Sequence, residues 1–542
     1  MAVRNGKVIL SKNIKMDSGY RNVLNISESD MITLMSNSSN IVYTNSTYSF
    51  MRENENSIYV EAPYGTCLQA NYLAFQNPDY SNKWFFAFVE EVNYVSNKTT
   101  EIKYKVDIFT TWNSYFSYKS CFVIREHVTD DSYHKHTVPE GLETGDYMVK
   151  YTVKKELDIT NCHIVMATNI NPLDGITAVG GGVYGGIVSG CSYYIFQSNT
   201  DFNNALVRIA NGGNSDSIVS IFYAPDWITN YNNASWNQGV AIVPNSQIAT
   251  SSSGIAIPLQ PTTIGNYTPA NKKLFNWPYV SYVISNNAGG SAEYHLEDFY
   301  DGGSHVASFD LYGTCTPGCS IRLVPHNYKV ASLDLIGNDF INNEYGITAG
   351  KLPIASWEND AYTNWLTQNA VNKNFQLAGA TFNAIAGTVK AVETGGEDMY
   401  QIGQGFREVF DVLRNEHNHS FNAIGAEGNI NSGDVSFSAR LLGYTGYFME
   451  IKEEYARIID NYFKLKGYKV NTVKVPNTSH RQNFNFVQIS GEDSCVYSNS
   501  HNGICVPPKD LDFINSLFRR GVTIWNNHAN LGDLSVSNNI VN

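Results

Sequence analysis

The histidines and carboxylates around residue 130 form the densest group of side chains that could perform chemistry. His127, His134 and His136 stand close together in the chain, with Glu126 before them and Glu140 after them. Two imidazoles at positions i and i+2 beside carboxylates are the residue types that ligate a metal ion or carry out acid–base catalysis. No second histidine cluster completes such a site, so the interpretation that we favour is a polar loop between strands.

The remaining reactive residue types give no better site. Cys315 and Cys319 are the one close pair among eight cysteines, and no second ligand cluster lies near them in sequence. We therefore expect reduced, mostly buried thiols and no bound metal. The sequence contains no nucleophile elbow, P-loop, zinc-protease motif or dinucleotide fingerprint. It predicts a protein that is not an enzyme and that uses no cofactor.

The composition indicates a large, folded and acidic protein. The chain has 542 residues, of which 43% are hydrophobic and 16% charged, and its net charge is −13. Because a domain typically has about 150 residues, this length suggests about three to four domains. Without a long basic run, recognition of DNA sequence through a Lys/Arg surface is disfavoured. Basic residues interrupt the first twenty positions, so we expect no secretory signal and folding in the cytoplasm.

The first 150 residues have the pattern of antiparallel strands. From Phe86 to Ile108, apolar side chains occupy mainly the even positions and charged side chains mainly the odd ones. A period of two is typical of a strand with one buried face. The pattern continues on both sides of Ser96, Asn97 and Lys98, which predicts a hairpin that turns there.

From about residue 155 to 320 the composition changes. Glycines crowd the stretch from 180 to 190, and no charge occurs between Asp226 and Lys272, which predicts a separate inserted domain. Within it, 192–197, 201–210 and 218–223 predict a strand, a helix and a strand. The uncharged run 175–200 is long enough to cross a membrane, but its glycines and β-branched residues favour a loop followed by a strand.

Two amphipathic helices are predicted near the C-terminus. The first has the apolar positions Ile451, Tyr455, Ile458, Tyr462 and Leu465, ends at Gly467 and is followed by a strand over 468–475. The second begins after two prolines and ends at Gly521. Its apolar positions are Leu511, Ile514, Leu517 and Phe518.

An apolar helical segment inside this β-rich chain is its most unusual feature. The 16 residues between Lys373 and Lys390 carry no charge, and a second amphipathic pattern follows. The segment is either a core helix or a membrane-active element. On the insertion scale its large apolar residues give only about −1.5 to −3 kcal/mol per chain, an energy that several copies would multiply. The candidate membrane-active residues are Phe375, Leu377, Phe382, Ile385, Val389, Val392, Ile402, Phe406, Val409, Phe410 and Leu413.

Three blocks of sequence resemble a known family. The chain is similar there to the distal tail-tube, or tail-knob, proteins of small short-tailed phages with protein-primed DNA replication. None of the blocks is catalytic, but the three occur in the family's order. They are FVEEVNY at 88–94 with TEIKYKVDIFTTW at 100–112, REHVTD at 125–130 with TVPEGLETG at 137–145, and GYKVNTVKVPN at 467–477 with Arg481 and GVTIW at 521–525.

The resemblance implies a fold and an organisation. The expected class is α+β, predominantly β and multidomain, with tube-forming antiparallel β-barrel domains. The implied segments are an N-terminal tube domain at 1–155, an inserted outer α+β domain at 156–320, a C-terminal tube domain at 321–370 with 441–542, and a long, partly helical loop at 371–440.

The resemblance also implies a function and partners. Family members form a homohexameric tube at the distal end of the virion tail, beside other tail and collar or connector proteins. Double-stranded DNA leaves through the lumen without sequence-specific binding, and an acidic tube suits that role because it does not grip a polyanion. The long loop plugs the lumen and then engages the host cell membrane, which favours the membrane-active interpretation of 371–440.

Two other function classes remain open on the sequence alone. A tail-associated cell-wall hydrolase would need a metal or carboxylate site, and the loop from His127 to His136 is the place for it. A receptor-binding appendage would form trimeric fibres and bind glycans through the Tyr- and Asn-rich middle domain. Metal analysis tests the first alternative, and the mass of the assembled particle tests the second.

Overall fold

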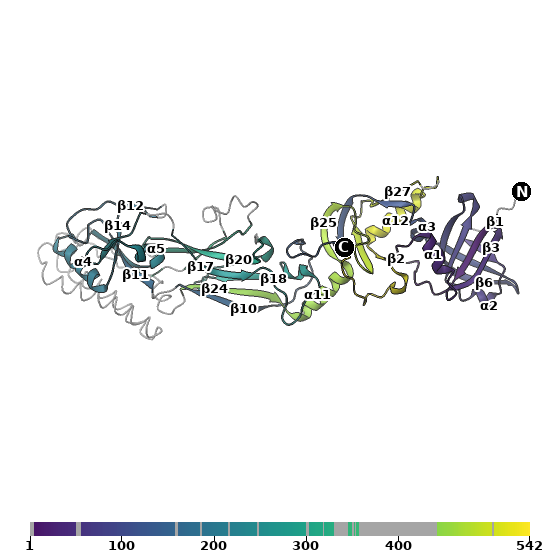
Figure 1. Ribbon diagram of the computed structural model, residues 1–542, viewed down its shortest axis with the longest axis horizontal. Helices are drawn as coiled ribbons and strands as arrows, with labels where there is room; N and C mark the ends of the chain where they lie inside the picture. The colour runs from purple at the N-terminus through teal and green to yellow at the C-terminus, as the bar shows by residue number, and fades with distance from the viewer. Residues whose placement is uncertain are drawn as a thin grey trace, which may run out of the picture. The chain divides into compact units, whose positions relative to one another are not determined.

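The chain folds into two units, each built from segments that are far apart in sequence. The computed structural model describes residues 5–49, 56–157, 161–184, 187–214, 217–245, 249–299, 303–317, 319–329, 345–349, 352, 354–356, 442–500 and 503–541. The first unit contains Met1–Gly145, Asn266–Pro278 and Lys452–Asn542. The second contains Asp146–Gly265 and Tyr279–Ile451. Figure 1 labels their elements.

A six-stranded antiparallel sheet opens the first unit. Its strand order is β3-β1-β5-β6-β7-β4, and the predicted hairpin is confirmed as β6 and β7, with Val92 opposite Ile102. The strands are β1 (Asn5–Ser11), β3 (Ile41–Ser49), β4 (Ser57–Val60), β5 (Tyr72–Asn77), β6 (Lys83–Ser96) and β7 (Thr99–Val106). The short helices among and after them are α1 (Glu28–Met35), α2 (Tyr64–Cys67), η1 (Pro78–Tyr80) and α3 (Ile108–Trp112).

Both faces of this sheet are buried. Along β1, Val8 and Leu10 belong to one hydrophobic core, whereas Ile9 belongs to another. Successive strand side chains point to opposite faces, so one strand supplies both cores. The core around Ile9 also contains Phe518 and Trp525 from the C-terminal part of the chain. The N-terminal and C-terminal sequence blocks therefore fold as one unit.

The C-terminal part of the first unit contains a five-stranded sheet of order β2-β28-β26-β9-β25. Only the pair β2 and β28 is parallel among the pairs of this sheet. Its strands are β2 (Asn22–Leu24), β9 (Cys121–Glu126), β25 (Tyr468–Lys474), β26 (Phe484–Ile489) and β28 (Val522–Trp525). The same part of the unit contains β8 (Phe116–Tyr118), β27 (Val496–Ser498), η5 (Lys272–Phe275), α11 (Glu453–Lys466), α12 (Pro508–Arg520) and η8 (His528–Asn530).

The two predicted C-terminal helices exist, but one buries a different face from the predicted one. In α12, Ile514, Leu517 and Phe518 are buried as expected, and Gly521 follows the helix with a φ of 90°. In α11 the predicted stripe is wrong, because Ile458 is 66% exposed. The buried face instead carries Ala456, Ile459, Asp460 and Phe463. The buried Asp460 carboxylate accepts hydrogen bonds from the segment that contains η5, which decides which face turns inward.

The described part of the second unit contains four sheets. A four-stranded sheet has the order β10-β24-β18-β19, and another has the order β17-β20-β21-β22. Their strands are β10 (Tyr147–Glu156), β17 (Ala249–Pro258), β18 (Val280–Ser285), β19 (Ser291–Tyr294), β20 (Val306–Thr314), β21 (Ser320–Pro325), β22 (Ile347–Thr348) and β24 (Gly443–Ile451). The 3₁₀ turn η6 (Leu296–Asp298) follows β19.

The predicted strand, helix and strand of the inserted region are confirmed. The five-stranded sheet has the order β16-β14-β11-β15-β23, and α4 packs on it through Phe202, Leu206 and Ile209. In the run 175–200 the predicted strand is present as β14, the expected loop contains the small β12–β13 hairpin, and a helix begins only at Asn199. The elements are β11 (Cys162–Thr168), β12 (Gly182–Tyr184), β13 (Ile187–Ser189), β14 (Ser192–Phe196), α4 (Asn199–Asn211), β15 (Ile218–Pro225), α5 (Asp226–Thr229), η4 (Tyr231–Asn233), β16 (Val240–Ile242) and β23 (Ile354–Ser356).

The units divide the chain at positions other than the predicted segment ends. β23 pairs with β15 of the predicted insert, and β24 pairs with β10 and β18, all within the second unit. The segment Asn266–Pro278, which lies inside the predicted insert, belongs to the first unit. Strand pairing between distant segments sets these boundaries, and composition does not report it. The tube, insert and plug roles of the four ranges stay predictions.

The orientation of α11 generates the first testable prediction. Phe463→Ala removes a fully buried ring and should cost about 3–5 kcal/mol of stability. Ile458→Ala on the same helix should change stability by no more than about 0.5 kcal/mol, because that side chain is mostly exposed. Urea denaturation followed by tryptophan fluorescence measures both. If Ile458→Ala destabilised the protein more than Phe463→Ala, the buried face of α11 would be the one predicted from periodicity.

Candidate functional site

The predicted membrane-active residues lie outside the part of the chain that the structure describes. All eleven fall in the range 357–441, so their role stays a prediction. They are Phe375, Leu377, Phe382, Ile385, Val389, Val392, Ile402, Phe406, Val409, Phe410 and Leu413. Among the described residues, no helix has the length and hydropathy needed to span a membrane.

The histidine and carboxylate cluster forms a buried junction in the first unit rather than an open site. His127 is 3% exposed, and its Nδ1 accepts a hydrogen bond of 2.7 Å from the N–H of Phe486. Its Nε2 lies 3.0 Å from the backbone oxygen of Lys464, so the proton is on Nε2. Both ring nitrogens are therefore occupied by the backbone. Burial lowers the pKa of His127 to about 4, which keeps the ring neutral.

Glu140 is the centre of this junction. Its fully buried carboxylate pairs with the guanidinium of Arg125 and with the ammonium of Lys273. The N–H of Lys469 donates to the same carboxylate at 2.8 Å. Arg125 also donates to the carbonyl of Gly467, 2.8 Å away. Glu140 thus connects β9, η5 and β25, which come from three separate stretches of sequence.

Gly467 shows how closely these stretches approach. Its φ is 64°, and an added Cβ would collide with the backbone carbonyl of Glu126. Glycine is the residue that adopts this conformation without steric cost. The end of α11 can therefore lie directly against β9, where the Arg125 side chain reaches it.

A second carboxylate secures the same strand on its other side. Glu126 has a fully buried side chain whose Oε1 lies 2.5 Å from the ammonium of Lys474. Its Oε2 accepts a 2.8 Å hydrogen bond from the N–H of Asn477. The Asn477 side chain donates to the carbonyl of His127 at 2.6 Å. The blocks at 125–145 and 467–477 are consequently joined through side chains as well as strand pairing.

The segment 266–278 completes the network and was not singled out from the sequence. Asn271 hydrogen-bonds Asp460 through its backbone N–H at 3.0 Å and through its side chain at 2.8 Å. Asp131 accepts from the Tyr468 hydroxyl at 2.6 Å and from the N–H of Lys272. Burial raises the pKa of Asp131, an effect that these hydrogen bonds oppose.

A sequence signal for this segment existed. Lys272 and Lys273 are adjacent charges at the end of a stretch that is uncharged from Trp227 onward. Two adjacent lysines after a long uncharged stretch suggest that at least one of them pairs with a specific acidic residue. For Lys273 that partner is Glu140, although burial still lowers the pKa of its ammonium.

The remaining candidates for chemistry also have structural contacts. His136 Nε2 lies 2.7 Å from the backbone oxygen of Asp130, and His134 Nδ1 lies 3.2 Å from the side-chain oxygen of Asn276. Cys319 is buried and donates to the carbonyl of Tyr223. Within the described ranges, no three His, Cys, Asp or Glu side chains converge as a metal site would require. The histidine contacts hold the loop within the first unit.

The depressed pKa of His127 generates a pH prediction. The unfolded chain binds a proton at this histidine below its ordinary pKa of 6.5, whereas the folded chain does so only below about 4. Stability from the neutral ring is therefore complete above pH 6.5 and is lost as the pH falls toward 4, by about 3 kcal/mol.

In His127→Gln, the amide can keep both backbone contacts but cannot titrate, so its stability should fall less between pH 7 and pH 4.5. Urea midpoints of the protein and the variant at both pH values measure the difference. Identical losses in both would show that another group controls the acid response.

Comparison with known proteins is consistent with this interpretation. A family model described as "Bacillus phage phi29, Tail knob protein gp9, C-terminal domain" matches residues 244–542. A second model, "Caudoviral major tail protein N-terminus", matches residues 4–117. The tail knob proteins gp9 of Bacillus phages phi29 and B103 are 24% and 23% identical to this chain. The first alignment covers 92% of both chains, and the second covers 87% of this chain and 88% of the relative.

A solved structure shares the fold over the whole length. The tail knob protein gp12 of bacteriophage C1 matches with a TM-score of 0.61 at 15% identity, covering 99% of this chain and 100% of that one. The predominantly β, multidomain class expected from the sequence is thereby confirmed. Because the tail knob family model spans more than half of the chain, the protein belongs to the phi29-type tail knob family and is a structural protein of a phage tail, not an enzyme.

Proposed function

We propose that the protein forms a hexameric conduit at the distal end of the tail, through which the phage genome is ejected. The observation that carries the proposal is the family match over 244–542, together with the tail-protein match over 4–117. In this role the chain contacts copies of itself and other tail, collar or connector proteins. Double-stranded DNA passes through the lumen.

An exposed strand edge supports self-association. β10 is an edge strand, and its consecutive residues Tyr147, Met148 and Val149 are 42%, 40% and 45% exposed. Neighbouring strand residues face opposite sides, so apolar surface is exposed on both faces of this edge. Exposed apolar edges lead to pairing with another chain. A contact between different patches on adjacent copies closes into a ring when the rotation permits it.

The charge of the chain supports passage of DNA rather than its retention. With a net charge of −13, the protein repels a polyanion overall. Phosphate contacts supply most of the non-specific affinity for DNA. A conduit of this composition lets the duplex slide without recognising its sequence.

The apolar range 371–440 supplies the membrane step of the proposal. Six exposed apolar stripes would form a patch large enough to aggregate, so they need shelter in the assembled particle. Copies around the axis can bury these stripes against one another and plug the lumen. At the host membrane the same stripes turn toward lipid, and the weak insertion energy of one chain is multiplied by the number of copies.

The role of β10 can be tested by charge. Met148→Lys with Val149→Lys should leave the isolated chain folded, because both side chains are well exposed. The ring should dissociate, because two lysines per edge would be buried without partners. Leu68→Lys, at a 59% exposed position directly after α2 in the first unit, serves as the control. Native mass spectrometry at micromolar concentration measures assembly, and undiminished hexamers in the β10 variant would exclude this edge as the interface.

The membrane step can be tested by deletion. Particles lacking 375–413 should still assemble but should fail to release dye from liposomes, because the apolar stripe is gone. Phe382→Asp combined with Phe406→Asp should weaken leakage in particles of unchanged mass. If the deletion variant cannot fold, the segment is a core helix. If the double-aspartate variant still releases dye, the membrane activity does not depend on this apolar stripe.

A further inference from the structure

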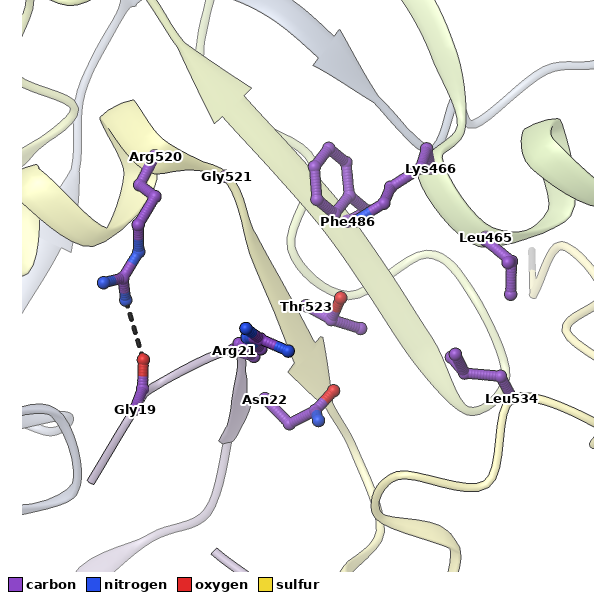
Figure 2. Close-up of a pocket in the computed structure, with 10 residues that line it drawn as sticks. All are labelled: Gly19, Arg21, Asn22, Leu465, Lys466, Phe486, Arg520, Gly521, Thr523 and Leu534. Carbon is purple, nitrogen blue, oxygen red and sulfur yellow. Dashed lines mark hydrogen bonds between the residues drawn. The ribbon is translucent and has the colours of Figure 1, made fainter. Parts of the chain in front are cut away.

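A basic pocket in the first unit has no role in the assignments above. It has a volume of about 540 Å³ and lies between the end of α11, the end of α12 and the parallel pair β2 and β28. Arg21, Lys466 and Arg520 line it, together with Phe486 and two leucines. Figure 2 shows these side chains, which come from five separate stretches of the chain, around the same space.

The three cations have no carboxylate partner among the described residues. Arg520 donates to the neutral carbonyl of Gly19 at 2.9 Å, drawn as the dashed line in Figure 2. The Lys466 ammonium lies 4.4 Å from the centroid of the Phe486 ring. Burial, together with the nearby Arg125 and Arg21 guanidinium groups, lowers the pKa of Lys466. Three positively charged residues therefore line the pocket without an ion-pair partner among the described residues.

The acids next to the lining residues are engaged elsewhere. Asp17 accepts a 2.7 Å hydrogen bond from the N–H of Gly19 within its own turn. Asp533 accepts from the N–H and hydroxyl of Ser535 at 3.0 and 2.5 Å. These are the carboxylates within two positions of a lining residue in sequence. An anion in the pocket would therefore displace no ion pair of these cations.

Helix termini explain only part of the charge. Lys466 and Arg520 stand in the last turns of α11 and α12, where a cation stabilises the partial negative charge of the helix end. Arg21 directly precedes the strand β2, so its charge does not interact with a helix terminus of its own segment. Its backbone oxygen accepts from the N–H of Thr523 at 3.1 Å, which holds its stem beside β28. Strand pairing thus holds the Arg21 backbone beside the pocket, and no ion pair of its guanidinium occurs among the described residues.

The pocket is also kept open by its backbone. Gly521 has a φ of 90°, and an added Cβ would lie 2.8 Å from the ring of Phe486. Glycine permits both the conformation and the close approach of the two walls. The parallel pairing of Asn22 with Thr523 fixes the opposite side.

We propose that this pocket binds a phosphate group. A phosphate monoester carries nearly two negative charges and three acceptor oxygens, and a nucleic-acid phosphodiester carries one charge and two free oxygens. Several cations around one pocket can bind either group. Arginine provides a planar fork of donors for phosphate, and lysine adds a point charge. Leu465 and Leu534 add apolar wall, and the volume is typical of a site for a small organic molecule. The phosphate belongs either to a free nucleotide-sized ester or to a nucleic-acid backbone. The inference does not depend on the conduit or on the membrane step.

Calorimetric titration of the full-length protein at low ionic strength tests the proposal with two probes, adenosine monophosphate and a short DNA duplex. Arg21→Gln with Lys466→Gln should weaken binding about tenfold or more, because each change removes a charge-assisted hydrogen bond. Lys98→Gln with Lys105→Gln, on the β6–β7 hairpin, removes the same charge and should change affinity less than twofold.

The two probes distinguish the source of the phosphate. Binding of the monophosphate alone assigns a free ester, and binding of the duplex that is lost in the pocket variant assigns a nucleic-acid backbone. Arg21→Glu serves as a second variant, because the Arg21 side chain is exposed and its reversal should leave the fold intact. No binding of either probe by the unaltered protein, or equal binding by both double variants, would overturn the proposal.

Discussion

The buried charge of Glu140 is the constraint on which the first unit depends. Removing an ionised carboxylate from water costs several kcal/mol unless opposite charges and hydrogen bonds replace the solvent. Here the replacement comes from Arg125 on β9, Lys273 in η5 and the N–H of Lys469 on β25. A chain that brought only two of these segments together would leave the carboxylate without a full set of partners. The buried carboxylate is therefore fully satisfied only when β9, η5 and β25 are all in place.

This requirement explains the course of the chain. The first unit includes Asn266–Pro278 although both flanking stretches fold in the second unit. From that segment, Lys273 forms an ion pair with Glu140. The Asn271 side chain donates a hydrogen bond to Asp460, and the N–H of Lys272 donates one to Asp131. A buried polar network of this kind contributes little net stability compared with apolar packing, but it is satisfied only in one arrangement. Its value to a structural tail protein is that it fixes how distant segments meet.

The same network shows why residue types alone do not establish chemistry. His127, Glu126 and Glu140 are the types that an enzyme uses for acid–base work, and they are close in sequence. Each is buried with its acceptors and donors occupied by the protein itself. A catalytic group needs a position where a substrate atom can replace a solvent contact. In this junction no such position is open to these three residues.

The sequence alone determined the features whose signals are local. The period of two gave the β6–β7 hairpin, the apolar spacing of Ile514, Leu517 and Phe518 gave the buried face of α12, and the middle region gave β14, α4 and β15. Short motifs also gave the family, because their order along the chain is itself sequence information. The apolar stripe at 375–413 remains a sequence prediction, outside the described residues.

Tertiary structure decided everything that depends on partners distant in sequence. Periodicity selected the wrong face of α11, because it counts apolar side chains and cannot see that Asp460 is bound by Asn271. The family resemblance grouped residues 441–542, which include β24, into one segment, whereas β24 pairs with β10 and β18 of the second unit. The sequence favoured a polar loop between strands around His127, whereas the structure has a closed junction there with Glu126 and His127 buried. In each case the deciding free energy comes from a hydrogen bond or ion pair between segments far apart in the chain, and local sequence does not encode which segment will arrive.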